Sequence, residues 1–259
     1  MIRLENVSKV FHPGTPNENV AIRQVGLTIR EGDFVTIIGS NGAGKTTLFN
    51  LVSGTMPVSA GRILINDADV TKHPEHQRAR YIGRIFQDPL LGTASNMMVA
   101  HNMMIAYRKG MKGLRISLNG RMRSFFREKL KDLQMGLEDR MDNNVGLLSG
   151  GQRQALTLLM MVISEPSLVL LDEHTAALDP KNAQIVLDLT SRFITDYGLT
   201  SMMITHNMSQ AIRYGNRLLM MDRGEIILDV AGEEKRQLTV EKLVEKFHEI
   251  RQEELENDE

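Results

Sequence analysis

A glycine-rich loop stands between an apolar segment and a helical one near the start of this sequence. Residues 39–47 read GSNGAGKTT and match the pattern of a phosphate-binding loop, or P-loop. Glycines at these positions let backbone N–H groups curl toward a phosphate. Lys45 would place its ammonium group against the β- and γ-phosphates, and Thr46 would offer its hydroxyl to Mg²⁺. The predicted nucleotide-binding residues are Gly39, Ser40, Asn41, Gly42, Ala43, Gly44, Lys45, Thr46 and Thr47.

Two carboxylates follow a second apolar segment, where residues 168–171 lead into Asp172 and Glu173. At the carboxyl end of a buried parallel strand, Asp172 is placed to hold magnesium, directly or through water. Glu173 would face the position of a hydrolytic water. Such a pair is weak evidence alone, because acidic residues commonly follow strands. After a P-loop, it predicts the second half of a nucleotide site.

A third candidate site is the stretch LSGGQ at residues 148–152. A serine and two glycines that open a helix make an anion cradle, because backbone N–H groups and the positive helix end face the ligand. The chain already has a better phosphate site in its P-loop. The sequence therefore raises the question of what the second cradle binds.

The elements that must position these groups alternate between strand and helix. The apolar pattern predicts strands at 2–11, 25–29, 33–39, 61–66, 81–86, 167–171 and 201–205. Helices are predicted at 45–52 with Gly54 as the stop, 121–133, 152–163 and 180–193. A hairpin is predicted over 217–228 and an amphipathic helix from Thr239. This alternation predicts an α/β fold with a mostly parallel sheet flanked by helices, and a mostly helical insert from about 96 to 163.

The composition is that of an ordinary globular protein of 259 residues, with 42% hydrophobic and 24% charged residues. The formal charge of −1 gives no electrostatic argument for a nucleic-acid partner. The absence of cysteine excludes disulfides and thiolate metal sites and fits a reducing compartment. The sequence shows no secretory signal and no run near the roughly 18 apolar residues that cross a bilayer. We expect a cytoplasmic protein that reaches the membrane through another protein.

The P-loop, the LSGGQ stretch and the acidic pair, in this arrangement, resemble the ATP-binding cassette (ABC) ATPases, and the resemblance extends over nearly the whole chain. Gln87 matches the family's Q-loop glutamine, Asp179 matches its D-loop and His206 matches its switch histidine. The resemblance implies a P-loop NTPase core with an N-terminal antiparallel β subdomain and an inserted α-helical subdomain. The implied boundaries are a single ABC domain at 1–240, made of a core at about 1–88 and 164–230 and a helical subdomain at about 89–163, followed by a C-terminal amphipathic helix and acidic tail at 239–259.

The resemblance also implies ATP and Mg²⁺ as cofactors and assigns roles to single residues. Gln87 would link the metal and the attacking water to the helical subdomain, and His206 would reach the γ-phosphate. In the family two cassettes face each other head to tail, so the second cradle would hold the ATP of the partner. The implied catalytic residues are Glu173, His206, Gln87 and Lys45. The implied metal residues are Thr46, Gln87 and Asp172. The implied residues on the ATP of the partner are Ser149, Gly150, Gly151, Gln152 and Asp179.

Two positions depart from the family's pattern. His174 stands where the family usually has proline, and it either changes the stiffness of the loop, adds a pH-sensitive neighbour to Glu173, or is a neutral substitution. The adenine-stacking aromatic residue, often tyrosine, would here be Phe11, with His12 nearby. A core phenylalanine is the alternative interpretation of Phe11.

The implied partners are a second nucleotide-binding subunit, with a homodimer favoured, an integral membrane permease and an extracytoplasmic solute-binding protein, and no nucleic acid. The segment 89–106 would dock a short helix of the permease through methionines, although core filling explains these methionines equally well. They are Met97, Met98, Met103 and Met104. The expected function is ATP hydrolysis that drives import of an amino acid or similar small polar solute, at the inner face of the membrane. The alternatives are a compact exporter or lipoprotein-extraction system, or a non-transport ABC ATPase. A P-loop kinase would give LSGGQ no role.

Overall fold

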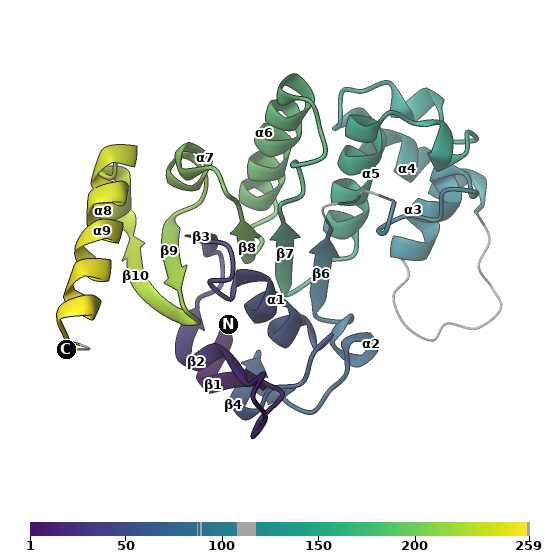
Figure 1. Ribbon diagram of the computed structural model, residues 1–259. Coiled ribbons are helices and arrows are strands. Elements are labelled where there is room, and N and C mark those ends of the chain that lie inside the picture. Colours follow the sequence, from purple (N-terminus) through teal and green to yellow (C-terminus); the bar gives the residue numbers. More distant parts are fainter. Residues whose placement is uncertain (87, 89, 108–117, 258–259) are drawn as a thin grey trace. The chain divides into compact units, whose positions relative to one another are not determined.

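The computed structural model describes residues 1–86, 88, 90–107 and 118–257 (Figure 1). The chain divides into two compact units, one of residues 1–75 and 200–259 and one of residues 76–199. The predicted boundaries between the core and the helical subdomain are not tested by this division and stay a prediction. Among the described residues, no helix is both long and apolar enough to cross a membrane.

The first unit contains an antiparallel sheet with the strand order β2-β1-β4-β5. Its strands are β1 (Ile2–Phe11), β2 (Asn19–Ile29), β4 (Ala60–Ile65) and β5 (Ala68–Asp69). Ile2 and Leu4 alternate with more exposed residues along β1 and are buried, as expected for a strand with one covered face. The expected N-terminal antiparallel part of the fold is therefore present.

The first unit also carries β3 (Phe34–Gly39), which pairs in parallel with β8 (Ser201–Ile204) and with β9 (Arg217–Asp222). Phe34 to Ile38 are all buried, because both faces of a parallel sheet are covered. β10 (Glu225–Ala231) adds to β9 as the second arm of a hairpin. Since β3, β8 and β9 run in the same direction, their carboxyl ends meet at one edge.

Helices pack on this part of the first unit. They are α1 (Lys45–Ser53), α7 (Met208–Arg213), α8 (Gly232–Arg236) and α9 (Val240–Asn257). α1 ends at Gly54, which has the left-handed conformation (φ 80°) of a helix C-cap. Leu243 of α9 is fully buried in a cluster with Ile38, Leu218 and Val230. The C-terminal helix is therefore part of the core that supports β3.

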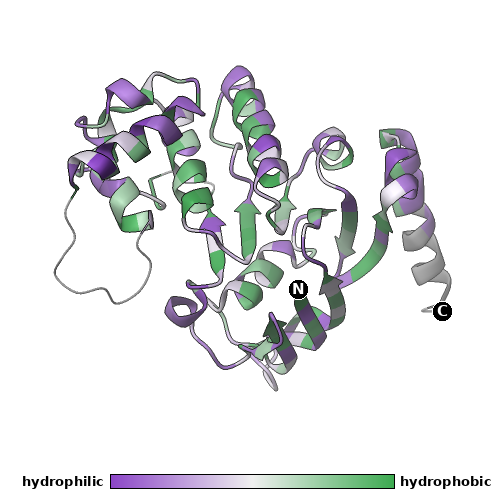
Figure 2. Cartoon of the chain, turned by 180° about the vertical axis from the view of Figure 1, so that it is seen from behind, coloured by the Kyte–Doolittle hydropathy of each residue, from purple (hydrophilic) through white to green (hydrophobic). Residues whose placement is uncertain are grey.

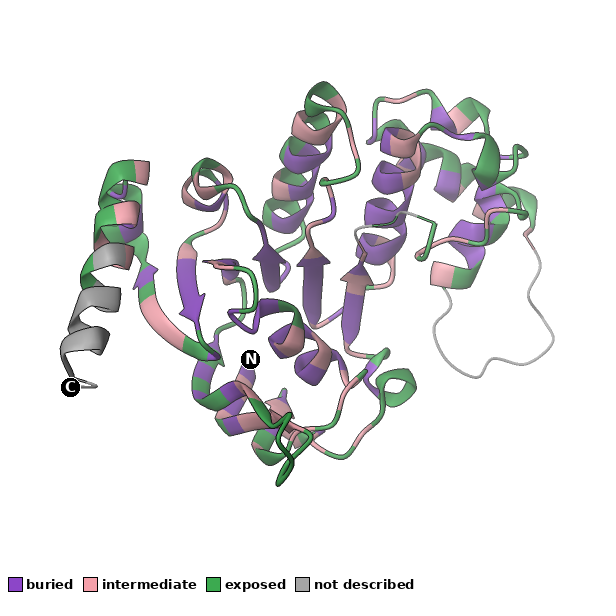
Figure 3. Cartoon of the chain, in the orientation of Figure 1, coloured by how far each residue is buried: buried purple, intermediate pink, exposed green. Residues whose placement is uncertain are grey.

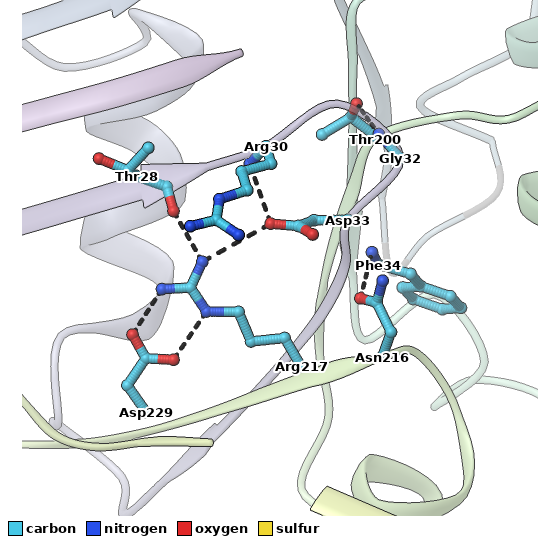
Figure 4. A network of polar contacts seen from close by, with 9 residues as sticks. All are labelled: Thr28, Arg30, Gly32, Asp33, Phe34, Thr200, Asn216, Arg217 and Asp229. Atoms are coloured by element: carbon cyan, nitrogen blue, oxygen red, sulfur yellow. Dashed lines mark hydrogen bonds and ion pairs between the residues drawn. The ribbon is translucent and has the colours of Figure 1, made fainter. Parts of the chain in front are cut away.

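Arg217 joins several segments of the first unit at the amino end of β9 (Figure 4). Its guanidinium donates to both carboxylate oxygens of Asp229 on β10 and, at 2.7 Å, to the carbonyl oxygen of Thr28 on β2. Asp33 lies 3.6 Å away as a second carboxylate. These contacts, the hydrogen bond to Asp229 first, raise the pKa of Arg217. The network fixes the start of β3 relative to β2 and β10.

The second unit contains β6 (Ile82–Ile85) and β7 (Leu168–Asp172), which pair in parallel. β7 is apolar and buried up to Leu171 (Figures 2 and 3). The helices of this part of the chain are α2 (Glu75–Arg78), α3 (Val99–Tyr107), α4 (Gly120–Lys131), α5 (Gly150–Ile163) and α6 (Pro180–Asp196). Two short 3₁₀ helices lie at Leu137–Asp139 and Val145–Leu147.

The predicted strands, helices and hairpin are confirmed, with small shifts at their ends. β2 begins at Asn19, six residues before the predicted start at Val25, because the alternating pattern breaks near Gln24, which has a positive φ of 42°. The strand β5 and the helices α2, α3, α7 and α8 were not predicted separately. α7 has six residues, which is too short for a clear helical period.

Candidate functional site

The P-loop joins β3 to α1 in the first unit. The N-cap residue of α1 is Gly44, with φ 99°, and no side chain caps this helix start. A helix start of this kind binds anions through its first N–H groups and its positive dipole end. A Cβ atom at Gly44 would lie 2.6 Å from the carbonyl oxygen of Ala21. Only glycine lets the loop pass this close to β2.

Lys45 points into the P-loop and is 5% exposed. Its ammonium group donates to the carbonyl oxygens of Gly39 and Ser40, each at 2.8 Å. The side chain is therefore held at the mouth of the loop by backbone acceptors. An ammonium group in this position can donate to phosphate oxygens that enter the loop.

The P-loop is also braced from the end of β9. The hydroxyl of Ser40 donates to Asp222 at 2.8 Å, and Asp222 is 2% exposed. Gly224 in the following turn donates its N–H to the carbonyl oxygen of Ala43. Asp222 was not predicted as a site residue, because 182 residues separate it from Ser40.

His206 follows β8 at the same edge of the sheet. The parallel register pairs Ile37 of β3 with Ile204 of β8, and the N–H of Thr205 donates to the carbonyl oxygen of Ile37. The P-loop, Asp222 and the exposed His206 therefore leave three neighbouring strands at one edge. Ligands of open α/β sheets bind at edges of this kind.

Phe11 is the last residue of β1, opposite Asn19 of β2, and is partly exposed. The ammonium group of Lys9 lies 5.4 Å from the centre of its ring. The ring is therefore not a core residue, which was the alternative interpretation. Its use as a stacking surface for adenine stays a prediction.

The acidic pair lies at the carboxyl end of β7 in the second unit. Asp172 accepts a hydrogen bond from Arg84 of β6 at 3.2 Å, and both side chains are mostly buried. Glu173 has φ 47°, which is unfavourable for a residue other than glycine. Strained backbone of this kind gathers at functional sites. Arg84 was not among the predicted site residues. A charged residue within an apolar strand was the available signal, because such a residue requires a polar partner once it is buried.

His174 follows the acidic pair and is buried, with 2% exposure. Its Nε2 lies 3.1 Å from the Thr190 hydroxyl on α6. Burial lowers the pKa of His174 from 6.5 to about 4. The histidine is therefore neutral at physiological pH. Of the roles predicted for it, that of a pH-sensitive neighbour of Glu173 does not apply at this pH.

The LSGGQ stretch forms the start of α5. Ser149 and Gln152 make a capping box, in which each side chain accepts a hydrogen bond from the backbone N–H of the other. The Gln152 side chain also donates to the carbonyl oxygen of Met135. The predicted cradle is thus partly satisfied by its own side chains. Ser149 remains exposed at the surface.

The two glycines of this stretch pack against the segment that starts α6. A Cβ atom at Gly151 would lie 3.3 Å from the side-chain oxygen of Asn182, and one at Gly150 would lie 3.3 Å from Leu178. Asn182 donates to Asp179, the N-cap of α6, through its backbone and its side chain. Its side-chain hydrogen bond is the main reason for the lowered pKa of Asp179. The second unit therefore brings LSGGQ and Asp179 together.

The predicted docking methionines fall into two groups. Met103 and Met104 are 0% and 5% exposed and fill the core, whereas Met97 and Met98 are each 37% exposed. A largely apolar pocket of about 330 Å³ lies in the same unit. Its lining includes Ile82, Arg84, Gly92, Ile105, Ala106, Thr157, Met160 and Met161.

The donor atoms fit magnesium that arrives with a nucleotide. In the described part of the chain, no group of three or more His, Cys, Asp or Glu side chains could hold a metal. Mg²⁺ binds through one or two carboxylates together with phosphates and water. The hydroxyl of Thr46 and the carboxylate of Asp172 are hard oxygen donors of this kind. The two belong to different units, and the third predicted ligand, Gln87, lies outside the described residues.

Comparisons with known proteins cover most of the chain. The profile of the family described as ABC transporter matches residues 22–176. The tyrosine transport ATP-binding protein of Clostridioides difficile (strain R20291) is 40% identical over 248 residues, which cover 95% of this chain and 98% of the relative. The phosphonates import ATP-binding protein PhnC of Lactococcus lactis subsp. cremoris (strain SK11) is 33% identical over 238 residues, with 90% of this chain and 94% of the relative covered.

A solved structure gives the same result. It is the dimeric post-hydrolysis state of the ATP-binding cassette MJ0796 bound to ADP and Pi. It aligns with a TM-score of 0.71 and 26% identity, over 89% of this chain and 98% of that one. The predicted fold class, a P-loop NTPase with an antiparallel sheet and helices, is confirmed.

Proposed function

Because the chain belongs to the ABC transporter family as an ATP-binding cassette and ATPase, we propose that it drives a separate membrane permease of an uptake system. The observation that carries this proposal is the presence of two glycine-bearing helix starts in one chain, one in the P-loop and one at LSGGQ, each of a kind that can bind an anion. α1 begins in the P-loop without a side-chain cap, whereas α5 begins after its exposed N-cap residue Ser149, which shares a capping box with Gln152. One nucleotide per chain needs only the first of them.

The second helix start is best explained by a second cassette. We propose that Ser149, Gly150, Gly151 and Gln152 bind the γ-phosphate of ATP held by the P-loop of the partner, with Asp179 beside it. Leu147 is 73% exposed just before this stretch, and Ala176 and Ala177 are exposed just before the D-loop aspartate. These exposed apolar side chains support dimerisation, because a partner subunit would cover them. The MJ0796 cassette is itself dimeric.

The proposed chemistry is the hydrolysis of Mg-ATP. Lys45 would hold the β- and γ-phosphates. Thr46, Asp172 and Gln87 would hold Mg²⁺, which would supply positive charge against the phosphoryl group. Glu173 orients and deprotonates the attacking water, and His206 holds the γ-phosphate from the end of β8. Hydrolysis removes the ligand that bridges two subunits, so the dimer opens.

An amino acid is the solute class that we propose. The relative named for tyrosine transport aligns over 95% of this chain, and another relative is named a methionine import ATP-binding protein. The ATPase subunit need not touch the solute, so this proposal rests on kinship alone. The import direction is supported by relatives named for phosphonate and methionine import.

The permease would dock on the pocket of the second unit. Leu91 at 68% exposure and Ile105 at 59% are large apolar residues in the segment that contributes to this pocket. Exposed apolar side chains beside a pocket mark an interaction site. A short amphipathic helix of the permease fits such a site, because its apolar face can enter the pocket.

Affinity purification from native membranes, followed by mass spectrometry, tests this function. Recovery of a polytopic permease is expected, and a co-purifying extracytoplasmic binding protein supports import. Ile105→Asp should abolish recovery of the permease while ATP binding remains. The matched control is Ile185→Asp, since Ile185 on α6 is also exposed, at 42%, but does not line the pocket. Recovery of ribosomal or chromosomal proteins without a permease would contradict the transport role.

A further inference from the structure

Arg84 places a permanent positive charge within a buried strand. Ile82 and Ile85 of the same strand are 7% and 0% exposed, and the side chain of Arg84 is 13% exposed. Arginine keeps its charge at every physiological pH. A charge removed from water in this way needs a compensating partner. Asp172 provides one, with 3.2 Å between the guanidinium nitrogen and Oδ2.

The position of this pair follows from the register of β6 and β7. Arg84 lies opposite Leu170 in the parallel pair, two residues before Asp172. The guanidinium also lies 4.9 Å from the centre of the Phe86 ring. A carboxylate and an aromatic face therefore both hold the cation beside the acidic pair.

We propose that Arg84 competes with Mg²⁺ for Asp172 and so sets the affinity of the cassette for the metal. This inference rests on the proposed role of Asp172 as a metal ligand. A guanidinium that contacts one carboxylate oxygen raises the electrostatic cost of bringing a divalent cation to the same group. Mg²⁺ can therefore use Asp172 fully only when it displaces Arg84 or shares the carboxylate with it.

The side chain has room to move when the metal arrives. Arg84 lines the pocket of about 330 Å³ in the second unit, together with Gly92, Ile105 and Thr157. A long flexible side chain beside this space can leave Asp172 without repacking the core. The proposed exchange therefore has space on the pocket side of the ion pair.

The test measures how strongly Mg²⁺ improves nucleotide binding. The dissociation constant of a fluorescent ATP analogue is measured with EDTA and with saturating Mg²⁺. The constant with EDTA divided by the constant with Mg²⁺ is the metal gain, which is larger when the metal improves binding more. This ratio cancels any direct attraction between Arg84 and phosphate. Arg84→Met should raise the metal gain roughly three- to tenfold, the size expected for one partly buried charge. Arg84→Lys, which keeps the charge, should stay within about twofold of the parent chain.

Two further variants distinguish the proposed effect from a folding defect. Arg84→Gln is neutral but can still donate to Asp172, so it must show the same rise as Arg84→Met. Arg80→Met is the matched control, because Arg80 lies 4.5 Å from the Tyr81 ring, as Arg84 does near Phe86, but is exposed. The control should leave the metal gain unchanged. An unchanged or smaller gain in both neutral Arg84 variants overturns the proposal.

Asp172→Asn separates this inference from the proposed function beneath it. If this variant keeps the full metal gain, Asp172 is not a metal ligand, and the proposed site and this inference both fail. If it loses the gain while the Arg84 variants behave as the parent chain does, only the competition by Arg84 is wrong.

Discussion

The hydroxyl of Ser40 donates a hydrogen bond to the carboxylate of Asp222, with 2.8 Å between Oγ and Oδ1. Ser40 belongs to the P-loop, and Asp222 is the last residue of β9. Because β9 pairs directly with β3, this bond fixes the beginning of the P-loop to the neighbouring strand. Asp222 therefore acts on the nucleotide site as a positioning residue.

Loss of this hydrogen bond should weaken ATP binding. Asp222→Ala removes the acceptor of Ser40, and we expect about tenfold weaker binding of ATP, together with a loss of about 1–3 kcal/mol in unfolding free energy. Ser40→Ala should act through the same contact, so the double variant should be little worse than the more severe single variant. Equilibrium binding of a fluorescent ATP analogue checks this. Additive effects of the two changes would show that Asp222 acts elsewhere.

Glu173→Gln should separate ATP binding from hydrolysis. The amide cannot accept the proton of the attacking water, so we expect turnover to fall by about 10²–10⁴-fold while ATP still binds. Phosphate release and size-exclusion chromatography with ATP measure the two effects, and an ATP-dependent dimer should accumulate. Glu165→Gln is the matched control, because exposed Glu165 in the same unit has the same φ of 47°. Undiminished turnover in Glu173→Gln would exclude Glu173 as the base.

The backbone of Glu173 should carry a cost in stability. Glycine adopts φ 47° without the Cβ clash that glutamate suffers, so Glu173→Gly should raise unfolding free energy by about 0.5–1 kcal/mol while hydrolysis is lost. Chemical denaturation checks the first part and an ATPase assay the second. Glu165→Gly should give a similar gain and retain activity. A destabilised Glu173→Gly would mean that contacts of the side chain outweigh the backbone strain.

His174 should make the chain less stable in acid. Its pKa of about 4 in the folded chain lies below the 6.5 of an ordinary histidine, so the unfolded chain binds more protons between these values. The contribution of His174 to the free energy of unfolding is therefore fully present above pH 6.5. It is lost as the pH drops toward 4, by up to about 3 kcal/mol. His174→Gln should flatten this part of the profile, as measured by chemical denaturation at several pH values. An unchanged slope between pH 6.5 and 4 would assign the loss to other groups.

The same burial predicts an unaltered pH profile of activity near neutrality. His174 stays neutral between pH 6 and 8, so His174→Gln should scale the rate of hydrolysis by one factor across this range. A change in the shape of the profile would show that the histidine titrates beside Glu173 after all.

The local elements of this protein were predictable because their signals are local. The apolar segment, the glycine loop and the following helix specify β3, the P-loop and α1 within twenty residues. Asp179 and Pro180 mark the start of α6, and Gly54 marks the end of α1, through chain chemistry that operates over a few residues. The acidic pair, the LSGGQ stretch and His206 were recognised in the same way, from their types and order.

The tertiary structure alone decided which distant side chains meet. The Ser40–Asp222 and Arg84–Asp172 contacts join residues 182 and 88 positions apart. Both depend on strand order and register, and a shift of one residue turns a side chain to the other face of a sheet. The burial of His174 against Thr190 likewise depends on how α6 packs, and its position after Glu173 does not reveal it. The sequence thus determined which chemical groups are present and in what order, and the packing of strands and helices determined which partners tune them.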